Sequence, residues 1–396
     1  MPSSHRDARE WATSSPRPRV VVSGYYGFGN LGDELILKVL VDTLNAKNVA
    51  VTVLSNDPSH TARTLGVRAV HRLNLVDIID ALINAHLFVS GGGGLFQDVT
   101  GPASAFYYGG LIRLARLFDV PVCFWSQGVG PLTHPVFGGL TRAMTGFALN
   151  ACEALTVRDH QSADLVENLT AKRPPVTADP VWLLKLPDGG TASESLLQTP
   201  QPLVKTIGVS LRPWPELTPP RLEALARLLV SLAVRYQEEG FKVEFLLFAY
   251  QYQTDWRLLS EFEAMLSRFA KLAQLTAFHC QILSDRTCTF DPMHPFWTGL
   301  HRCSVFFGMR YHSLVLALLA GKPVFGLAYD PKVQSLLTTL KLPGVHVALM
   351  EGLRVETVQR DLMTLEFPDL KPFKTQAWAN LHLLEEMIHR AMASHR

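Results

Sequence analysis

The stretch VVVSGYYGFGNLGDE (residues 20–34) runs from a β-branched strand through a glycine-rich turn into the start of a helix. Within it, residues 27–32 match the G-x-G-x-x-G pattern of dinucleotide-binding turns. A pyrophosphate at this helix start would, however, meet the carboxylates of Asp33 and Glu34 instead of bare N–H groups. We therefore reject a dinucleotide site and expect Asp33 to act as a general base, with stabilisation of the helix start as the alternative for both carboxylates.

Beyond this stretch, short β-branched or aromatic runs alternate with helical patterns, which is typical of parallel α/β layers. We expect strands at residues 20–23, 49–54, 87–90, 122–125 and 154–157, and again at 206–210, 242–248, 281–283, 305–307 and 324–327. The main helices are expected at 31–46, 105–118, 137–150, 160–169, 219–239, 254–273 and 311–320.

This order predicts two doubly wound, Rossmann-like α/β domains that face each other across a cleft. The Pro-, Gly- and Ser-rich segment in the middle of the chain indicates a linker. We expect a disordered tail at 1–18, an N-terminal domain at 19–185, the linker at 186–204, a C-terminal domain at 205–372 and a final helix at 373–396.

The overall charge excludes some classes of partner. The 37 Lys and Arg nearly balance the 35 Asp and Glu, so no broad field attracts nucleic acid, and anion binding must be local. The five cysteines lack the spacing of a metal site and indicate reduced thiols in a cytoplasmic protein. No integral membrane segment is expected, because Gly321, Lys322 and Pro323 interrupt the most apolar run of the second half.

Small residues follow two of the expected strands. Four consecutive glycines, Gly91 to Gly94, come after one strand, where they would let the backbone approach a ligand and point its N–H groups inward. Gln127 follows another strand, in a turn that could equally be a plain strand-to-loop connection. We expect Asn30, Gly93, Gly94 and Gln127 to contact the substrate.

Cationic side chains also follow strands. These are Arg158, Arg212, Arg310 and Lys332, with His312 close to one of them. A single arginine after a strand is usually a solvated surface residue, but several in this position favour a convergent site for phosphate and carboxylate. His312 could instead be a core histidine, and Lys332 an exposed helical lysine. We expect Arg310 to have little packing of its own, so that its loss would barely affect stability.

These motifs occur in a familiar order: GNLGDE at 29–34, GGGG at 91–94 followed by Phe96 and Asp98, SQGVG at 126–130, VRD at 157–159, and Gly308-x-Arg310-x-His312-Ser313. The ordered set, over roughly residues 20–333, resembles the polysaccharide pyruvyl transferase family, in particular its CsaB type that modifies bacterial cell-wall polymers. No single motif is specific.

The resemblance implies a fold like that of GT-B glycosyltransferases, phosphoenolpyruvate as donor, and a sugar with two suitably placed hydroxyls as acceptor. The products would be a pyruvate ketal and free phosphate. No metal or other cofactor would be needed. Asp33, Arg158, His312 and Lys332 fall on functional positions of the family, and Arg310 lies in the same motif as His312. Arg212 is assigned from its position alone.

Ketal formation requires an acid to protonate the donor's methylene carbon and a base for the sugar hydroxyl, and we assign these roles to His312 and Asp33. Acceptors in the family are cell-wall or exopolysaccharide units, often lipid-linked, which implies transient work at the inner face of the membrane. The aromatic segment 248–256 departs from the family, and Tyr250, Tyr252 and Trp256 could stack on sugar rings or simply pack.

Two alternatives remain open. A GT-B glycosyltransferase that uses a nucleotide sugar would share the fold and the basic residues, and would hold the ribose through a carboxylate, for which Asp330 and Glu244 are the candidates. A non-catalytic glycan-binding protein on the same fold would not need Asp33, His312 and four cations to converge.

Overall fold

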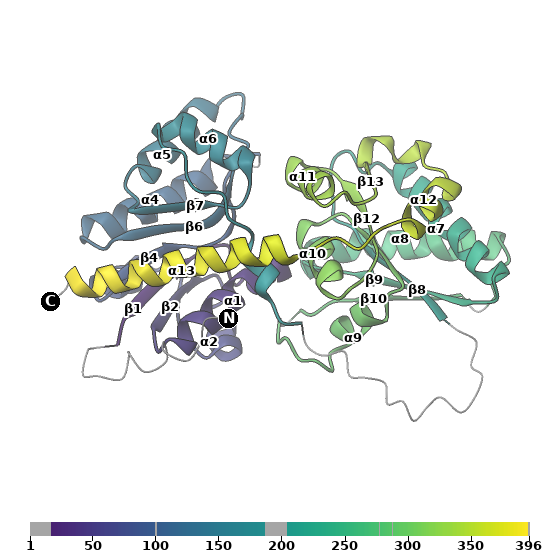
Figure 1. Cartoon of the computed structure of the whole chain (residues 1–396), viewed down its shortest axis with the longest axis horizontal. Coiled ribbons are helices and arrows are strands. Elements are labelled where there is room, and N and C mark those ends of the chain that lie inside the picture. The colour runs from purple at the N-terminus through teal and green to yellow at the C-terminus, as the bar shows by residue number, and fades with distance from the viewer. Residues whose placement is uncertain (1–16, 100, 187–203, 277, 287, 395–396) are drawn as a thin grey trace. The chain divides into compact units, whose positions relative to one another are not determined.

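Two parallel β-sheets organise the chain, one in each of two units. The computed structural model describes residues 17–99, 101–186, 204–276, 278–286 and 288–394. The first unit comprises Met1–Leu184 together with Leu370–Arg396, and the second comprises Lys185–Asp369 (Figure 1). The expected tail and linker fall almost wholly outside the described residues.

Within the described residues, the first unit contains a seven-stranded parallel sheet. Its strands are buried along most of their length because helices cover both faces, which accounts for their nearly continuous apolar sequences. They pair in the order β3-β2-β1-β4-β6, and both β5 and β7 also pair with β6. The strands are β1 (Arg19–Ser23), β2 (Ala50–Ser55), β3 (Arg68–His71), β4 (Leu87–Ser90), β5 (Gly93–Phe96), β6 (Val122–Val129) and β7 (Ala154–Val157).

The four consecutive glycines form a kink between two strands, since Gly91 and Gly92 separate β4 from β5 and Gly93 and Gly94 begin β5. Since β7 occupies one edge of β6, β4 and β5 share the other, with Phe88 opposite Val122 and Gly93 opposite Gln127. The register shifts after Gly93. The kink therefore redirects the backbone at the carboxyl end of β4.

Helices cover both faces of this sheet. One face carries α3 (Leu75–Ile83), α4 (Ala103–Leu117), α5 (Gly138–Leu149) and α6 (His160–Thr170), whose apolar sides share one core with the strands. On the other side lie α1 (Leu31–Ala46), the 3-10 helix Pro180–Leu183 and α13 (Lys371–Ser394), and α2 (Pro58–Leu65) packs on β2 and β3. The C-terminal helix α13 thus belongs to the first unit and runs along its sheet (Figure 1).

The second unit repeats the plan with a six-stranded parallel sheet in the order β10-β9-β8-β11-β12-β13. The strands are β8 (Val204–Ser210), β9 (Lys242–Phe248), β10 (His279–Leu283), β11 (Val305–Gly308), β12 (Val324–Ala328) and β13 (Gly344–His346). The helices are α7 (Pro219–Glu238), α8 (Tyr252–Leu272), α9 (Pro295–Arg302), α10 (Tyr311–Leu319), α11 (Pro331–Thr339) and α12 (Val355–Met363), with a 3-10 helix at Val347–Gly352.

Both sheets reverse their winding direction next to their first strand, between β1 and β4 and between β8 and β11. This is the doubly wound arrangement expected from the sequence, and the α/β class is confirmed. The expected elements are present with boundaries shifted by a few residues, whereas the strands β3, β5 and β13 and the helices α2, α3, α9 and α12 were not expected.

Candidate functional site

The candidate residues of the first unit lie at the carboxyl edge of its sheet. Asn30 and Asp33 follow β1, Gly93 and Gly94 follow the end of β4, and Arg158 follows β7. Ligands of doubly wound sheets bind at this edge, where the strand order reverses. The structure thus brings these residues to the edge where binding is expected.

Asp33 lies in the first turn of α1, against the glycine kink. Its carboxylate accepts a hydrogen bond from the Asn30 amide, with 2.5 Å between Asn30 Nδ2 and Asp33 Oδ2. A Cβ atom at Gly93 would lie 2.9 Å from Asp33 Oδ1, and the φ of Gly93 is +119°, which only glycine adopts readily. Glycine at position 93 therefore makes room for the carboxylate.

Glu34 has a larger role than the sequence argument gave it. Its Oε1 accepts a hydrogen bond of 2.8 Å from the Gly27 N–H, so this carboxylate holds the glycine-rich turn against the helix start. Burial raises the pKa of Glu34 to about 7, although the hydrogen bonds from the turn oppose the rise. The only sequence signal was a second acidic residue next to Asp33.

Tyr26 adds a buried hydroxyl beneath the same turn. Burial, followed by the charges of Asp33 and Glu34, raises the pKa of Tyr26 well above its ordinary value. Among the described residues its hydroxyl has no hydrogen-bond partner. Gly24 and Gly91 make room for the tyrosine, because a Cβ atom at either position would lie under 3 Å from its phenol group.

The Arg158 guanidinium lies face-on over Gly128. A Cβ atom at Gly128 would lie 2.7 Å from Arg158 Nη2 and 3.0 Å from Cζ, so this position also has room only for glycine. Two carboxylates are close by: Asp179 Oδ2 lies 3.5 Å from Nη1, and Asp159 Oδ2 lies 3.7 Å from Nε. The arginine is held in place by acidic neighbours and by the absence of a side chain beneath it.

The glycine kink connects the cation with the carboxylate. Asp33 lies against Gly93, while Arg158 Nη2 lies 3.8 Å from a Cβ atom placed on Gly94. Adjacent backbone positions thus lie beside a carboxylate and a guanidinium, which gives one small region side chains of both charges.

Two other motif residues brace this edge from within. Gln127, expected to contact the substrate, is fully buried, and its amide nitrogen donates to Ser90 O (2.8 Å) and Ser90 Oγ (2.7 Å). It therefore ties β6 to the end of β4. Asp98 accepts hydrogen bonds from the N–H groups of Thr133 and His134 and from the Thr141 hydroxyl, which fixes the start of α5.

In the second unit, Arg310 is engaged in a buried ion pair. Its Nε and Nη2 atoms donate to the two carboxylate oxygens of Asp255, at 3.0 Å and 2.5 Å. Asp255 is fully buried, Arg310 is 8% exposed, and the Asp255 carboxylate also accepts from the Tyr250 and Gln251 N–H groups. The expectation that Arg310 has little packing of its own is wrong, since it neutralises a buried carboxylate.

His312 is the second residue of α10 and is half-buried. Its ring meets the Tyr311 ring edge-on, with 5.3 Å between the centroids. The next residue, Ser313, donates its hydroxyl to the Arg310 carbonyl (2.7 Å), which fixes the turn that carries both basic side chains. Partial exposure distinguishes His312 from a core histidine.

Lys332 and Arg212 differ in their partners. Lys332 Nζ lies 3.0 Å from Asp330 Oδ2, and the other oxygen of Asp330 caps α11 by accepting from the Val333 N–H. Arg212 donates to the Tyr329 hydroxyl (3.0 Å), and its Nε is buried without a hydrogen-bond partner in the described part of the chain. Arg212 forms no ion pair with any described residue, which leaves its charge available for an anion.

The aromatic segment divides into a packed and an exposed part. Tyr250 is buried, and burial raises the pKa of its hydroxyl. Tyr252 and Trp256 lie on the first turns of α8 with 4.8 Å between their ring centroids, and Arg286 covers the Tyr252 ring at 3.4 Å. Trp256 is exposed, whereas Tyr250 packs in the core.

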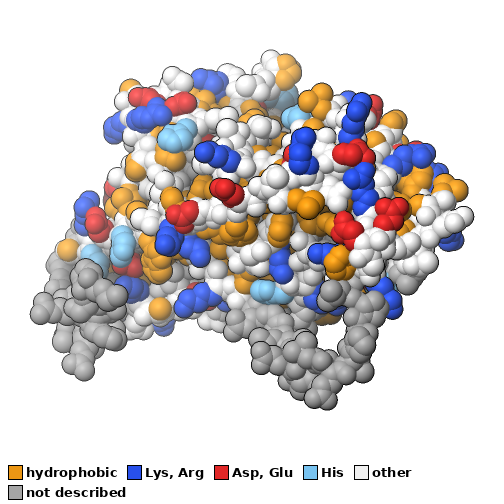
Figure 2. Space-filling model, turned by 45° about the vertical axis from the view of Figure 1, so that its right-hand side comes forward, with side chains coloured by type: hydrophobic (Ala, Val, Ile, Leu, Met, Phe, Trp, Pro, Cys, Tyr) orange, Lys and Arg blue, Asp and Glu red, His pale blue; other side chains and the backbone are white. Residues whose placement is uncertain are grey.

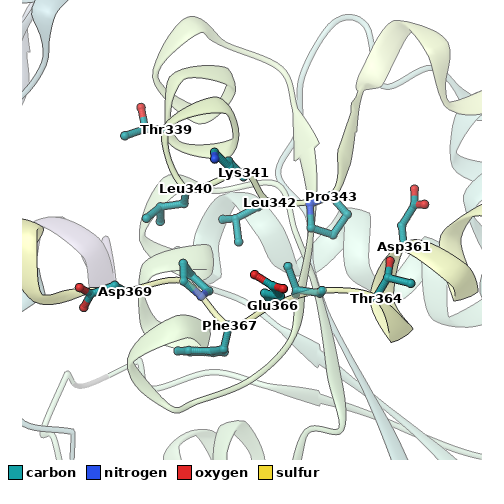
Figure 3. Close-up of a pocket in the computed structure, with 12 residues that line it drawn as sticks. Thr339, Leu340, Lys341, Leu342, Pro343, Asp361, Thr364, Glu366, Phe367 and Asp369 are labelled. Carbon is teal, nitrogen blue, oxygen red and sulfur yellow. The ribbon is translucent and has the colours of Figure 1, made fainter.

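A groove of about 630 Å³ lies elsewhere in the second unit (Figure 3). It is lined by residues 339–343, from the end of α11 to the residue before β13, and by Asp361, Glu366, Asp369 and their neighbours on and after α12. Residues 339–343 precede β13, so they place the groove at the amino end of that strand, and its three acidic residues outnumber Lys341, which does not suit an anionic donor. It is not the candidate site.

The surface charge and the possible metal ligands of the described residues do not indicate a second site. On the face drawn in Figure 2, Lys and Arg side chains are scattered among Asp and Glu. Within the described ranges, no group of three or more His, Cys, Asp or Glu side chains is placed to hold a metal ion. No helix that the structure describes is long and apolar enough to cross a membrane.

The profile of one family, polysaccharide pyruvyl transferase, matches residues 30–331. The chain belongs to the polysaccharide pyruvyl transferase family. The match begins at Asn30, the second residue of the GNLGDE motif, contains the other motifs named above, and ends at the residue before Lys332. No curated protein matches the sequence closely.

Solved structures resemble this member of the family in fold. The UDP-GlcNAc 2-epimerase of Neisseria meningitidis, bound to UDP-GlcNAc, is 12% identical with a TM-score of 0.59, covering 93% of this chain and 100% of its own. That of Methanocaldococcus jannaschii is 10% identical with a TM-score of 0.61, covering 94% and 100%. A glycosyltransferase of Rickettsia africae is 10% identical with a TM-score of 0.53, covering 95% and 97%. The GT-B-like fold expected from the sequence is confirmed.

Proposed function

We propose that this family member transfers the pyruvyl group of phosphoenolpyruvate to a sugar of a cell-wall or exopolysaccharide glycan, forming a cyclic ketal and releasing phosphate. The observation that carries the proposal is the pairing at the glycine kink, where Asp33 and Arg158 lie against adjacent residues of the family motif. A base and a phosphate-binding group in one small region are what this transfer needs.

The donor carries a phosphate and a carboxylate, so several cations must neutralise it. We assign these to Arg158 and Arg212, with Arg310 and Lys332. The Nε of Arg212 has a donor to offer, because no described residue accepts from it. Arg310 and Lys332 already face Asp255 and Asp330, so they contribute through the hydrogen-bond donors that these carboxylates leave.

The proton transfers follow from the chemistry of the enol phosphate. His312 protonates the methylene carbon, which makes C2 an oxocarbenium-like centre. One sugar hydroxyl adds to C2 as Asp33 takes its proton, phosphate then leaves, and the second hydroxyl closes the ketal and loses its own proton. The sum is phosphoenolpyruvate plus diol giving ketal plus phosphate, with no metal or nucleotide cofactor.

The contacts of two carboxylates weigh against a nucleotide-sugar donor. Glu244, near the amino end of β9, accepts hydrogen bonds from Arg302 and Thr206. Asp330 caps α11 and pairs with Lys332. Neither is therefore placed to hold a ribose freely. We further propose a cytoplasmic enzyme whose acceptor is lipid-linked, so that it works at the inner face of the membrane, with Trp256 stacking on an acceptor sugar.

Phosphate release tests the proposal. The enzyme is incubated with phosphoenolpyruvate and a panel of glycans, or with nucleotide sugars, and phosphate and ketal are measured. We expect phosphate only from phosphoenolpyruvate with a diol acceptor, and a loss of at least about a hundredfold in His312→Gln and Asp33→Asn. Turnover of a nucleotide sugar in place of phosphoenolpyruvate would refute the proposal.

Gly128→Ala tests the role of Arg158 without changing a charge. The new methyl would displace the guanidinium, so donor affinity should fall at least about tenfold, and the melting temperature should fall as well because Arg158 also faces the buried carboxylate of Asp179. Gly352→Ala is the matched control, since its Cβ meets no atom within 4 Å. Equal donor affinity in the two variants, measured by calorimetry, would remove Arg158 from the donor site.

A further inference from the structure

Arg212 differs from the other cations assigned to the donor in what holds it. The others already form ion pairs with carboxylates of the chain, namely Arg158, Arg310 and Lys332. Arg212 pairs with no carboxylate of the described residues. Its Nη1 donates instead to the Tyr329 hydroxyl, over 3.0 Å, and this hydroxyl is a neutral acceptor. Arg212 therefore keeps an unopposed positive charge.

Tyr329 also restrains Arg212 through its ring. The guanidinium carbon of Arg212 lies over the Tyr329 ring, 5.2 Å from its centroid, which is within range of a cation–π contact. Tyr329 is only 6% exposed, so its own position is fixed by packing. The Trp214 ring meets the Tyr329 ring edge-on, with 4.8 Å between the centroids, and lies 5.5 Å from the same guanidinium carbon. The guanidinium is thus held by aromatic side chains that add no charge.

This contact lies at the edge of the second sheet where a ligand is expected. Arg212 lies two residues after the end of β8, and Tyr329 directly follows β12. Strand β11 lies between β8 and β12, so the hydrogen bond between the two side chains connects the strands on either side of it. The winding of the sheet reverses between β8 and β11, and doubly wound sheets bind ligands at this reversal.

The backbone that carries Arg212 is stiff. Pro213 and Pro215 alternate with Arg212 and Trp214, and each proline fixes its own φ and disfavours a helical conformation of the residue before it. The Trp214 carbonyl accepts from the Leu217 N–H, over 3.0 Å, which closes a turn. The Nε of Arg212 is buried and has no acceptor among the described residues. This fixed guanidinium therefore has a hydrogen bond to offer a ligand.

We propose that Tyr329 is a positioning residue that holds Arg212 as a phosphate-binding group. A carboxylate in place of the phenol would also hold the arginine but would oppose its charge. Without the Tyr329 hydroxyl, the guanidinium loses its fixed direction, and binding an anion then includes the cost of ordering a long side chain. The inference rests on the proposed function only for the donor, whose phosphate carries more negative charge than its carboxylate and so suits an unopposed cation.

Calorimetric titration of the full chain with inorganic phosphate tests the proposal without donor or acceptor. The wild type should bind phosphate. Arg212→Ala should weaken this binding at least about tenfold, because it removes a charge-assisted contact, and Tyr329→Phe, which keeps the ring, should weaken it about threefold to tenfold. The double variant should bind no more weakly than Arg212→Ala alone, because Tyr329 acts through Arg212.

Tyr236→Phe is the matched control. Tyr236 is another tyrosine of the second unit whose ring lies beneath a cation, with 5.7 Å between Lys205 Nζ and the ring centroid. Lys205 lies at the amino end of β8, however, on the other edge of the sheet from Arg212. Tyr236→Phe should therefore bind phosphate like the wild type.

Chemical rescue separates positioning from a purely structural role of Tyr329. Guanidinium ion at millimolar concentration should restore part of the phosphate binding of Arg212→Ala, because the Tyr329 hydroxyl still offers it an acceptor. The rescue should be absent in Arg212→Ala/Tyr329→Phe. A tyrosine that only packs would give the same rescue in both variants, and that result would contradict the proposal.

Three further results would overturn the proposal. The wild type could fail to bind phosphate, Tyr329→Phe and Tyr236→Phe could bind it equally well, or the losses of the single variants could add in the double variant. Competition with phosphoenolpyruvate tests the donor separately. If phosphate binding follows the expected pattern but phosphoenolpyruvate does not displace phosphate, the role of Tyr329 is upheld and the proposed donor is refuted.

Discussion

At the scale of single residues, Glu34 couples the glycine-rich turn to pH. Its carboxylate is buried, and its pKa rises from 4.5 to about 7, so the folded chain holds this proton over a range where the unfolded chain has lost it. The stabilisation that comes from keeping the proton on Glu34 is complete below pH 4.5 and is lost as the pH rises through 7. The difference corresponds to about 3 kcal/mol.

Glu34→Gln should remove this part of the pH dependence. The amide oxygen can still accept from the Gly27 N–H, but it does not titrate, so the fall in the free energy of unfolding between pH 4.5 and 8 should be about 3 kcal/mol smaller in the variant. Urea unfolding at several pH values measures it, with Glu261→Gln, an exposed carboxylate, as control. Parallel curves for wild type and Glu34→Gln would contradict the assignment.

At the scale of elements, the Arg310–Asp255 pair ties the start of α10 to the start of α8. Removing one partner leaves a buried charge unpaired, so Arg310→Ala and Asp255→Ala should each lower the free energy of unfolding by about 3–5 kcal/mol. The double variant should lose less than the sum of the two. Arg302→Ala, which breaks the solvent-exposed pair with Glu244, should cost less than about 1 kcal/mol. If urea unfolding gave Arg310→Ala and Arg302→Ala the same loss in the free energy of unfolding, the buried pair would contribute no more to stability than the surface pair.

The Arg310–Asp255 pair is one of the contacts that the sequence could not predict. Hydrophobic periodicity predicted most strands and helices, because each buries a continuous or amphipathic face. It could not predict β5, which begins with two glycines and forms only because the edge of β6 continues past β4. Strand ends likewise placed Asp33 and Arg158, but not the partners Asp179 and Asp255, since those contacts are set by tertiary packing and not by local pattern.

At the scale of the whole molecule, the first unit is assembled from both ends of the chain. Helix α13 begins more than 200 residues after the end of β7, yet Trp125 Nε1 donates to the Asn380 carbonyl (3.1 Å) and the Thr156 hydroxyl to the Asn380 side chain (2.7 Å). The 3-10 helix packs on the same helix through Trp182 and Phe373. The expected domain scheme treated this helix as a separate final element, whereas it completes a core.

Fragments of the chain test this organisation. In α13, Leu381, Leu384, Met387 and Ile388 are buried, and at about 1.5–3 kcal/mol each they contribute about as much as the whole stability of a typical domain. A fragment of residues 17–184 should therefore lack a cooperative unfolding transition, and joining residues 370–394 to it by a flexible linker should restore one. A fragment of residues 204–369 has its complete sheet and should unfold cooperatively alone.

Urea unfolding followed by circular dichroism measures all three fragments. An Asn380→Leu change in the joined fragment checks that the restored state uses the native contacts, because it should lower the transition midpoint. Cooperative unfolding of residues 17–184 alone, at the midpoint of the joined fragment, would show that α13 does not stabilise the first unit.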